Sequence, residues 1–232
     1  MNAPREEFKY ETHLHTKETS ACAKNTARQM VRAYKEAGYQ GIIVTDHFFN
    51  GNTTVPARLP WEERVRLFCL GYENAKEEGS ILGLDVFFGW EYGYHHTDLL
   101  TYGLDKEFLL AHPDLLSLDL PTYVRLVRDN GGFITHAHPF REAFYILHQR
   151  FYPDLVDAVE VINGSHTNPE FDRKAAEYAA MHGLIPVSGT DAHSISPERF
   201  AGIKATRRLN SCLDFISLLR SREDYSLLGK PV

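Results

Sequence analysis

Hydrophobic and polar residues alternate along this chain in a way that is typical of β–α units. Short runs rich in Val, Ile and Phe are followed by longer segments with apolar residues at helical spacing. The short runs predict strands over residues 8–15, 41–47, 84–92, 98–104, 132–139, 156–164, 184–193 and 201–207. The longer segments predict helices over residues 25–37, 61–78, 122–129, 142–149, 169–182 and 211–221. This order predicts an α/β fold, either a closed, irregular barrel or an open doubly wound sheet.

The chain shows no sign of division into domains. Its 232 residues contain no internal repeat, low-complexity tract or Pro/Gly/Ser-rich linker, and the length suits one large domain. We therefore expect residues 1–232 to form a single domain. No G-x-G-x-x-G motif follows the first predicted strand, so dinucleotide binding is unsupported.

Composition narrows the partners and the compartment. The 31 acidic residues exceed the 25 basic ones, giving a formal net charge of −6, which argues against a nucleic-acid surface. Nucleic acid is expected only as a nucleotide or short oligonucleotide substrate. Cys22, Cys69 and Cys212 are scattered, which indicates neither a disulfide scaffold nor a cysteine zinc site. Without a signal sequence or a membrane-length apolar stretch, we expect a cytoplasmic protein with no membrane partner.

Histidine is unusually abundant, and its placement is informative. The chain has 12 His, as many as Tyr, and His is the commonest metal ligand. Several imidazoles and carboxylates fall at the C-terminal ends of five predicted strands, which would meet on one face of a parallel barrel. They are His13, His15, Asp46, His47, Glu91, His136, His138, Asp191 and His193. Because such groups are costly to bury without partners, a shared metal partner is the simplest explanation.

Local spacing supports a metal site. Side chains alternate along a strand, so His13 and His15 share a face, as do Asp191 and His193. The same reasoning applies to the residue 136–138 pair, in which we expect His138 to be the ligand and His136 to support it. Asp46 is either a ligand or the group that orients a neighbouring ligand.

These motifs resemble the PHP superfamily, which is named for its polymerase and histidinol-phosphatase members. The residues that carry the resemblance are HLHT at 13–16, TDH at 45–47, G-x-E at 89–91, AHP followed by Phe-Arg at 137–141, and GTDAHS at 189–194. The resemblance implies a distorted (β/α)7 barrel with a metal centre at the C-terminal ends of the strands. It also implies two or three divalent ions and hydrolysis of phosphoesters.

The resemblance further implies a distribution of ligands among the ions. It assigns one ion to His13, His15, Glu91 and Asp191. Glu91 would also bind a second ion, together with His138. A third ion would be bound by His47 and His193. Two departures concern residues that many members have. Many members have a His or Asp shortly after H-x-H, where residues 17–21 of this chain offer Glu18 as a candidate substitute at a different spacing. Asp98 stands where a His is common.

We therefore predict a metal-dependent phosphoesterase that acts on a small phosphorylated substrate. Mixed His and carboxylate ligands suit Zn²⁺, Mn²⁺ or Fe²⁺, and metal-activated water can attack phosphorus. Arg141 is the expected phosphate clamp. Further substrate-binding candidates are Lys17, Arg199 and His166, and proton-transfer candidates are His193 and Asp46.

Two alternatives belong to other functional classes. An amidohydrolase-like enzyme would also use metal-activated water, although such enzymes usually have a bridging modified lysine. No Lys ends a predicted central strand here. The other alternative is a domain that binds metal without catalysis.

Overall fold

The computed structural model describes residues 7–144 and 146–229. The described residues form one nine-stranded sheet with the strand order β7-β6-β5-β4-β3-β2-β1-β8-β9. The strands are β1 (Phe8–Leu14), β2 (Gly41–Val44), β3 (Asp85–Tyr94), β4 (Thr97–Tyr102), β5 (Phe133–His136), β6 (Ala158–Asn163), β7 (Ile185–Gly189), β8 (Gly202–Ala205) and β9 (Tyr225–Leu228).

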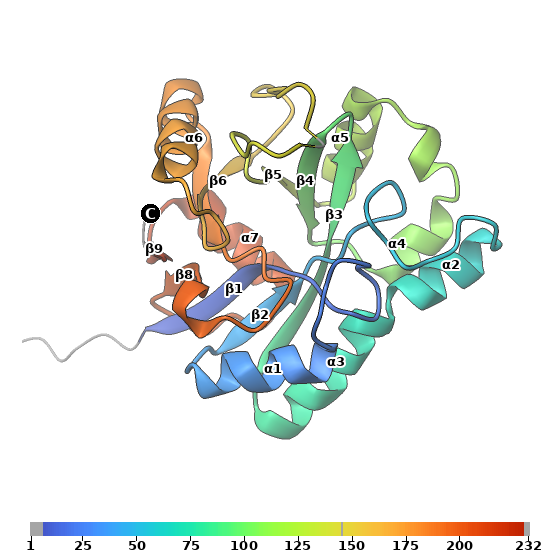
Figure 1. Cartoon of the computed structure of the whole chain (residues 1–232), viewed down its shortest axis with the longest axis horizontal. Helices are drawn as coiled ribbons and strands as arrows, with labels where there is room; N and C mark the ends of the chain where they lie inside the picture. The colour runs from blue at the N-terminus through green and yellow to red at the C-terminus, as the bar shows by residue number, and fades with distance from the viewer. Residues whose placement is uncertain (1–6, 145, 230–232) are drawn as a thin grey trace, which may run out of the picture.

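Helices connect most of these strands. The α-helices are α1 (Ala27–Glu36), α2 (Trp61–Phe68), α3 (Leu70–Leu82), α4 (Lys106–Ala111), α5 (Leu120–Asp129), α6 (Pro169–His182) and α7 (Cys212–Ser221). Two short 3-10 helices, η1 (Leu115–Ser117) and η2 (Pro197–Arg199), lie in loops. Figure 1 shows α1 and α3 side by side along the outside of β1, β2 and β3. Among the described residues, every helix is too short or too polar to cross a bilayer.

Helix boundaries follow local chemistry. The side chain of Thr26 accepts a hydrogen bond from the backbone N–H of Gln29, and the Gln29 side chain accepts one from Thr26, so α1 begins with a capping box. Helix α6 has Pro169 in its first turn, where no N–H is needed, and ends at Gly183 with φ of 64°. The predicted helices over residues 25–37 and 169–182 are thus confirmed.

The sheet is mixed, which confirms an α/β fold and refines its topology. Strands β1, β2 and β3 are parallel, and so are β5, β6 and β7. Strand β4 is antiparallel to both β3 and β5. The β3–β4 connection is therefore a tight hairpin, and no helix separates these strands as a uniform series of β–α units requires.

The two halves of the sheet nearly close into a barrel where the end of β1 meets the chain after β7. Leu14 and Ala192 form an isolated parallel bridge. The N–H of His15 donates to the carbonyl of Ala192 at 3.0 Å, and the Ala192 N–H donates to the carbonyl of His13 at 3.2 Å. This contact brings residues about 180 positions apart in the sequence to the same end of the barrel.

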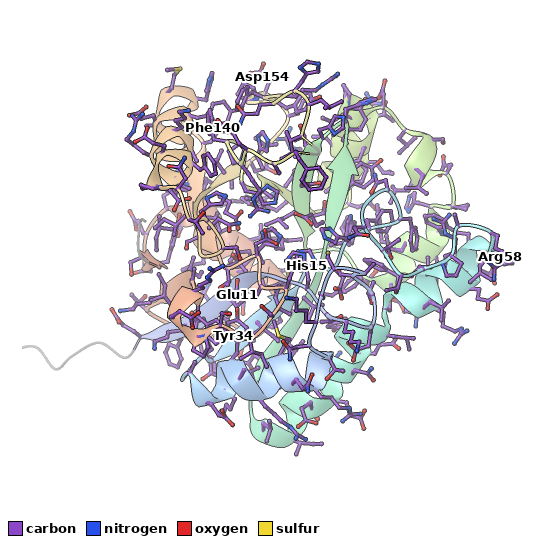
Figure 2. The ribbon with its side chains drawn as sticks, viewed as in Figure 1. Glu11, His15, Tyr34, Arg58, Phe140 and Asp154 are labelled. Carbon is purple, nitrogen blue, oxygen red and sulfur yellow. The ribbon has the colours of Figure 1, made fainter. Side chains whose placement is uncertain are left out.

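Buried hydrogen bonds of Glu11 link β1 to the chain after β7 at this contact. Its Oε1 accepts hydrogen bonds from the N–H groups of Thr12, His13 and Thr190, at 2.9, 2.8 and 2.9 Å. Its Oε2 accepts one from the hydroxyl of Tyr34 at 2.6 Å, and Figure 2 shows Glu11 and Tyr34 beside each other. One buried carboxylate thus joins β1, the segment after β7, and α1.

Alternation along β1 separates an apolar outer layer from a polar interior. Leu14 packs with Met30, Val31 and Val44 in the apolar layer between the sheet and α1. His13 lies on the opposite side and is fully buried. The same-face prediction for residues 13 and 15 is confirmed, since Leu14 points outward between them.

Some predicted elements are shorter than expected or absent. The predicted helix over 61–78 is two helices that meet at Cys69. The predicted helix over 142–149 is wrong for its described residues, since 142–144 and 146–149 contain no helix, and residue 145 lies outside the description. The strands predicted to end at residues 139 and 193 end earlier, because His138 and Asp191 have φ of 29° and 55°, which a pleated strand cannot continue.

We expect Glu11→Ala to destabilise the metal-free protein strongly. It leaves three buried N–H groups unpaired, and because each costs about 1–3 kcal/mol, the free energy of unfolding should fall by at least about 3 kcal/mol in urea denaturation. Glu7→Ala is the control, because Glu7 makes an exposed ion pair with Lys204, which is worth less than about 1 kcal/mol. Equal losses in the two variants would contradict the role given to Glu11.

Candidate metal centre

Imidazoles and carboxylates from both halves of the sheet meet at one end of the barrel. Four overlapping groups of side chains each place one donor atom per residue within 4.8 Å of the others. The groups are His13, His15 and Glu91; His13, His138 and Asp191; Glu91, Asp98 and His138; and His15, His47 and His193. We call the five buried residues His13, His15, Glu91, His138 and Asp191 the central cluster.

The donor atoms in the central cluster are spaced like the ligands of one ion. His13 Nε2 lies 3.1 Å from His15 Nε2, and these two nitrogens lie 3.4 and 3.1 Å from Asp191 Oδ1. His13 Nε2 also lies 3.3 Å from Glu91 Oε1. Bonds of about 2.0–2.1 Å at a tetrahedral angle separate ligand atoms by about 3.3 Å. The geometry therefore matches a set of ligands around a common centre.

Glu91 connects the central cluster to the other groups. Its Oε1 lies 3.2 Å from His138 Nε2, and its Oε2 lies 3.6 Å from His15 Nε2 and 2.6 Å from His47 Nδ1. Glu91 is only 1% exposed, so its charge depends on the imidazoles around it, of which His47 is the nearest to Oε2. Its position between four imidazoles also suits coordination of a cation.

A second set of donors lies beside the central cluster, and we call Cys22, His47 and His193 the outer cluster. His47 Nε2 lies 3.2 Å from Cys22 Sγ and 3.3 Å from His193 Nε2. Burial raises the pKa of the Cys22 thiol, but hydrogen bonds with His193 and His47 outweigh it and lower that pKa to about 6. Sequence reasoning missed Cys22, which comes seven residues after His15 in the same loop.

The pKa values of two neighbouring imidazoles in the central cluster are shifted in opposite directions. Burial alone would lower the pKa of His13, but Glu160, Asp191 and Glu91 raise it well above its usual value. The pKa of His15 is well below its usual value because of burial and the nearby His193 and His47. His15 is thus held in the neutral form that binds metals.

The pKa values of two acidic groups in the centre are shifted in opposite directions. Burial would raise the pKa of Asp191, but Arg141, His13 and His15 hold it well below its usual range. Arg141 contributes a 2.5 Å ion pair to Asp191 Oδ2. Burial and Glu91 raise the pKa of Asp98 to about 6, and its Oδ2 lies 4.0 Å from His138 Nε2.

Glu160, which sequence reasoning missed, orients two members of the central cluster. Its Oε1 lies 3.0 Å from His13 Nδ1, and its Oε2 accepts the N–H of His138 at 3.0 Å. A carboxylate on the far nitrogen of an imidazole fixes the tautomer and increases the basicity of the other nitrogen. The available signal was a single Glu inside the apolar strand over 156–164.

Two predicted ligands, Asp46 and Glu18, lie outside every group of donors described above. Both carboxylate oxygens of Asp46 accept hydrogen bonds at 2.6 Å, from the N–H and hydroxyl of Thr16 and from the hydroxyl of Ser20. Burial raises the pKa of Asp46 to about 6 against these bonds. Glu18 accepts from the N–H of Ala27 at the start of α1. Both carboxylates therefore position loops beside the centre.

His136 also lies outside the groups of metal-ligand donors. Its ring packs near Phe151 and Tyr178, its Nδ1 is buried without a hydrogen-bond partner, and burial lowers its pKa to about 3. The same-face argument for the residue 136–138 pair is wrong because β5 ends at His136 and His138 turns into left-handed backbone.

The predicted substrate-binding residues fall in different places. A cavity of about 740 Å³ opens over the centre and includes Arg141, and an adjoining cavity of about 400 Å³ includes both Arg141 and Arg199. Lys17 is exposed and lines neither cavity. His166 also lines neither, and its Nδ1 lies 2.7 Å from Asp172 Oδ1.

Comparisons place this fold among known structures. No protein-family model and no curated protein sequence matches the chain. A two-domain protein from Bacteroides vulgatus that contains a predicted PHP-like metal-dependent phosphoesterase matches with a TM-score of 0.71 and 16% identity, over 97% of this chain and 65% of that one. A proposed metal-dependent phosphoesterase from Bifidobacterium adolescentis matches with a TM-score of 0.54 and 16% identity, over 82% and 90% of the two chains.

A third match comes from a different class of hydrolase. An amidohydrolase from Chromobacterium violaceum, with bound sulfate and no metal, matches with a TM-score of 0.58 and 16% identity, over 97% of this chain and 98% of that one. The chain therefore shares its fold with structures described as a PHP-like and as a metal-dependent phosphoesterase, which agrees with the resemblance at the level of fold, and also with an amidohydrolase.

We expect Glu160→Gln to lower the pKa of His13 in the metal-free protein. Glu160 is the leading charge that raises this pKa, and Gln keeps the shape of the side chain without its charge. The pKa is measured by NMR titration of ¹⁵N-labelled imidazoles after chelator treatment. Glu170→Gln is the control, since Glu170 is exposed and pairs with Arg173. An unchanged His13 pKa in Glu160→Gln would contradict the orienting role.

Proposed function

We propose that this chain is a hydrolase that uses two or three divalent ions to cleave phosphoester bonds in a small phosphorylated substrate. The observation that carries the proposal is the sharing of Glu91 and Asp191 by several imidazoles at the base of one cavity. Its volume of about 740 Å³ lies within the usual range for small-molecule sites. We also propose that the sheet is a distorted form of the (β/α)7 barrel, with the β3–β4 hairpin as its distortion.

The side chains present fit this group of ions. His13, His15, Glu91 and Asp191 would bind one ion, and the carboxylates of Glu91 and Asp98 would bind a second with His138. His47 and His193 remain for a third. Imidazole and carboxylate donors suit Zn²⁺, Mn²⁺ or Fe²⁺. The two oxygens of Glu91 support the fit, since Oε1 lies 3.3 Å from His13 Nε2 and 3.2 Å from His138 Nε2, and Oε2 lies 3.6 Å from His15 Nε2.

Bound ions would supply Lewis acidity, which lowers the pKa of coordinated water and neutralises phosphate charge. The protein itself would supply orientation and a dry, shaped site. Arg141 lines both cavities, so its guanidinium would bind phosphate oxygens where the cavities meet. Arg199 would act at the far side of the smaller cavity, and the Tyr94 and His95 region at the mouth would contact the rest of the substrate.

Amide hydrolysis is the second candidate, because the structural neighbour from Chromobacterium violaceum is an amidohydrolase. The same ions would suit attack on a carbonyl carbon. Among the described residues that line the larger cavity there is no lysine, so the modified lysine usual in such enzymes has no counterpart there. This difference favours phosphoester hydrolysis.

Metal analysis and activity assays test the proposal together. We expect protein purified without chelators to retain divalent metal and to hydrolyse p-nitrophenyl phosphate or its bis-ester. We expect His13→Ala and Asp191→Ala each to lose more than about a hundredfold in kcat/KM, because removing a ligand costs more than disturbing its outer partner. His182→Ala is the control, because His182 is exposed on α6. Absence of metal, or activity unaffected by both substitutions, would refute the proposal, and turnover of amides alone would favour the second candidate.

We expect Arg141→Ala to reduce kcat/KM for the active phosphate ester by about 10–100-fold, because a hydrogen bond to a charged group is worth about 1.5–3 kcal/mol. Arg173→Ala is the control, since Arg173 pairs with Glu170 and Glu177 on the surface of α6. Steady-state kinetics at fixed metal loading measure the effect. Equal kinetics in the two variants would show that Arg141 does not bind substrate.

A further inference from the structure

The thiol of Cys22 belongs to the outer cluster rather than standing alone. Its Sγ lies 3.2 Å from His47 Nε2, which in turn lies 3.3 Å from His193 Nε2. We propose that Cys22 is a thiolate ligand of the ion that His47 and His193 hold. This inference rests on the proposed metal-dependent function and adds to it a soft ligand with its own metal preference.

The hydrogen bonding of His193 leaves the lone pair of its Nε2 directed toward His47. His193 Nδ1 lies 3.1 Å from the backbone carbonyl of Asp191. A carbonyl oxygen only accepts hydrogen bonds, so Nδ1 carries the proton of the neutral ring. His193 Nε2 is therefore an unprotonated donor atom for a cation, and it faces His47.

The spacing of the outer cluster also resembles that of ligands around one ion. Bonds of about 2.0–2.1 Å to nitrogen and about 2.3 Å to sulfur, at a tetrahedral angle, separate two nitrogens by about 3.3 Å and a nitrogen from a sulfur by about 3.6 Å. The observed separations of 3.3 and 3.2 Å are close to these values. Small shifts of the exposed thiol would complete the geometry.

Glu91 fixes the tautomer of His47 that leaves Nε2 available to a metal ion. Its buried Oε2 lies 2.6 Å from His47 Nδ1, on the opposite side of the ring from Cys22. An ion at Nε2 would leave the ring proton on Nδ1, where it faces this oxygen. That arrangement is the usual one for a metal-bound imidazole with a carboxylate behind it.

The backbone holds Cys22 against His47 and His193. On one side of it, the Ala21 N–H donates to the carbonyl of Asn52 at 2.8 Å, and on the other, the Lys24 N–H donates to the carbonyl of His193 at 2.7 Å. The loop is thus tied to the chain after β7 at the point where the thiol meets the imidazoles. A ligand held in place before binding costs less conformational entropy to order.

A thiolate ligand changes which metal this position selects. Sulfur favours Zn²⁺, Co²⁺ and Fe²⁺ over the harder Mn²⁺ and Mg²⁺. The other two cysteines cannot share this role in the described structure, because Cys69 is buried in the apolar core and Cys212 begins α7. They are therefore suitable controls.

Cobalt spectroscopy tests the ligand directly. We expect the full-length, chelator-treated protein titrated with Co²⁺ to show a near-ultraviolet thiolate-to-cobalt charge-transfer band. Cys22→Ser should lose the band, whereas Cys212→Ser and Cys69→Ala should keep it, with circular dichroism verifying that each variant is folded. Cobalt binding without the band, or a band that survives in Cys22→Ser, would overturn the assignment and leave the metal-dependent function standing.

Thiol reactivity gives a second readout that does not depend on activity. Cys22 is exposed, so its reaction with Ellman's reagent should be fast in the metal-free protein and slow by about tenfold or more with Zn²⁺, since a coordinated thiolate is no longer a free nucleophile. An unchanged rate with Zn²⁺ bound would also overturn the assignment. Failure of the protein to bind either ion would overturn both this inference and the proposed function.

Discussion

The burial of ionisable groups at one end of the barrel is the constraint on which the rest of the structure depends. Glu91 and Asp191 are 1% and 3% exposed and lie among several imidazoles. Charges removed from water are tolerated only with opposite charges or cations nearby. Arg141 compensates one oxygen of Asp191, and His47 Nδ1 lies 2.6 Å from Glu91 Oε2. The carboxylate and imidazole donors gathered there are the groups for which we propose divalent cations.

Holding such groups together requires a scaffold that is itself polar and fully hydrogen-bonded. Glu11 links β1 to the chain after β7 by hydrogen bonds, and Glu160 orients His13. Asp46 and Ser20 fix the loop that follows β1. These carboxylates contact the ligands or their backbone without joining the donor groups. They keep the ligand atoms at separations suitable for metal binding, which is how a site gains affinity from preorganisation.

The loop after β1 contacts both the hydrogen-bonded scaffold and the imidazoles of the candidate centre. Ser20 Oγ lies 3.1 Å from His15 Nδ1 and accepts the N–H of His47 at 3.0 Å. Two residues later, Cys22 Sγ lies 3.2 Å from His47 Nε2. The same loop therefore orients two imidazoles through a hydroxyl and offers a thiol of its own. Under the ligand assignment proposed for Cys22, a change at this position would alter the choice of metal while the barrel stays the same.

The sequence by itself determined the α/β class and the gathering of His13, His15, Glu91, His138 and Asp191, because alternation and strand ends are local properties of a chain. It could not determine that β3 and β4 form a hairpin, since strand pairing depends on contacts across the sheet. Nor could it show that His136 faces away from His138, which depends on left-handed backbone at residue 138. The supporting carboxylates and the position of Cys22 depend on long-range contacts between loops. Only the tertiary structure decided which polar residues face the centre and which hold it in place.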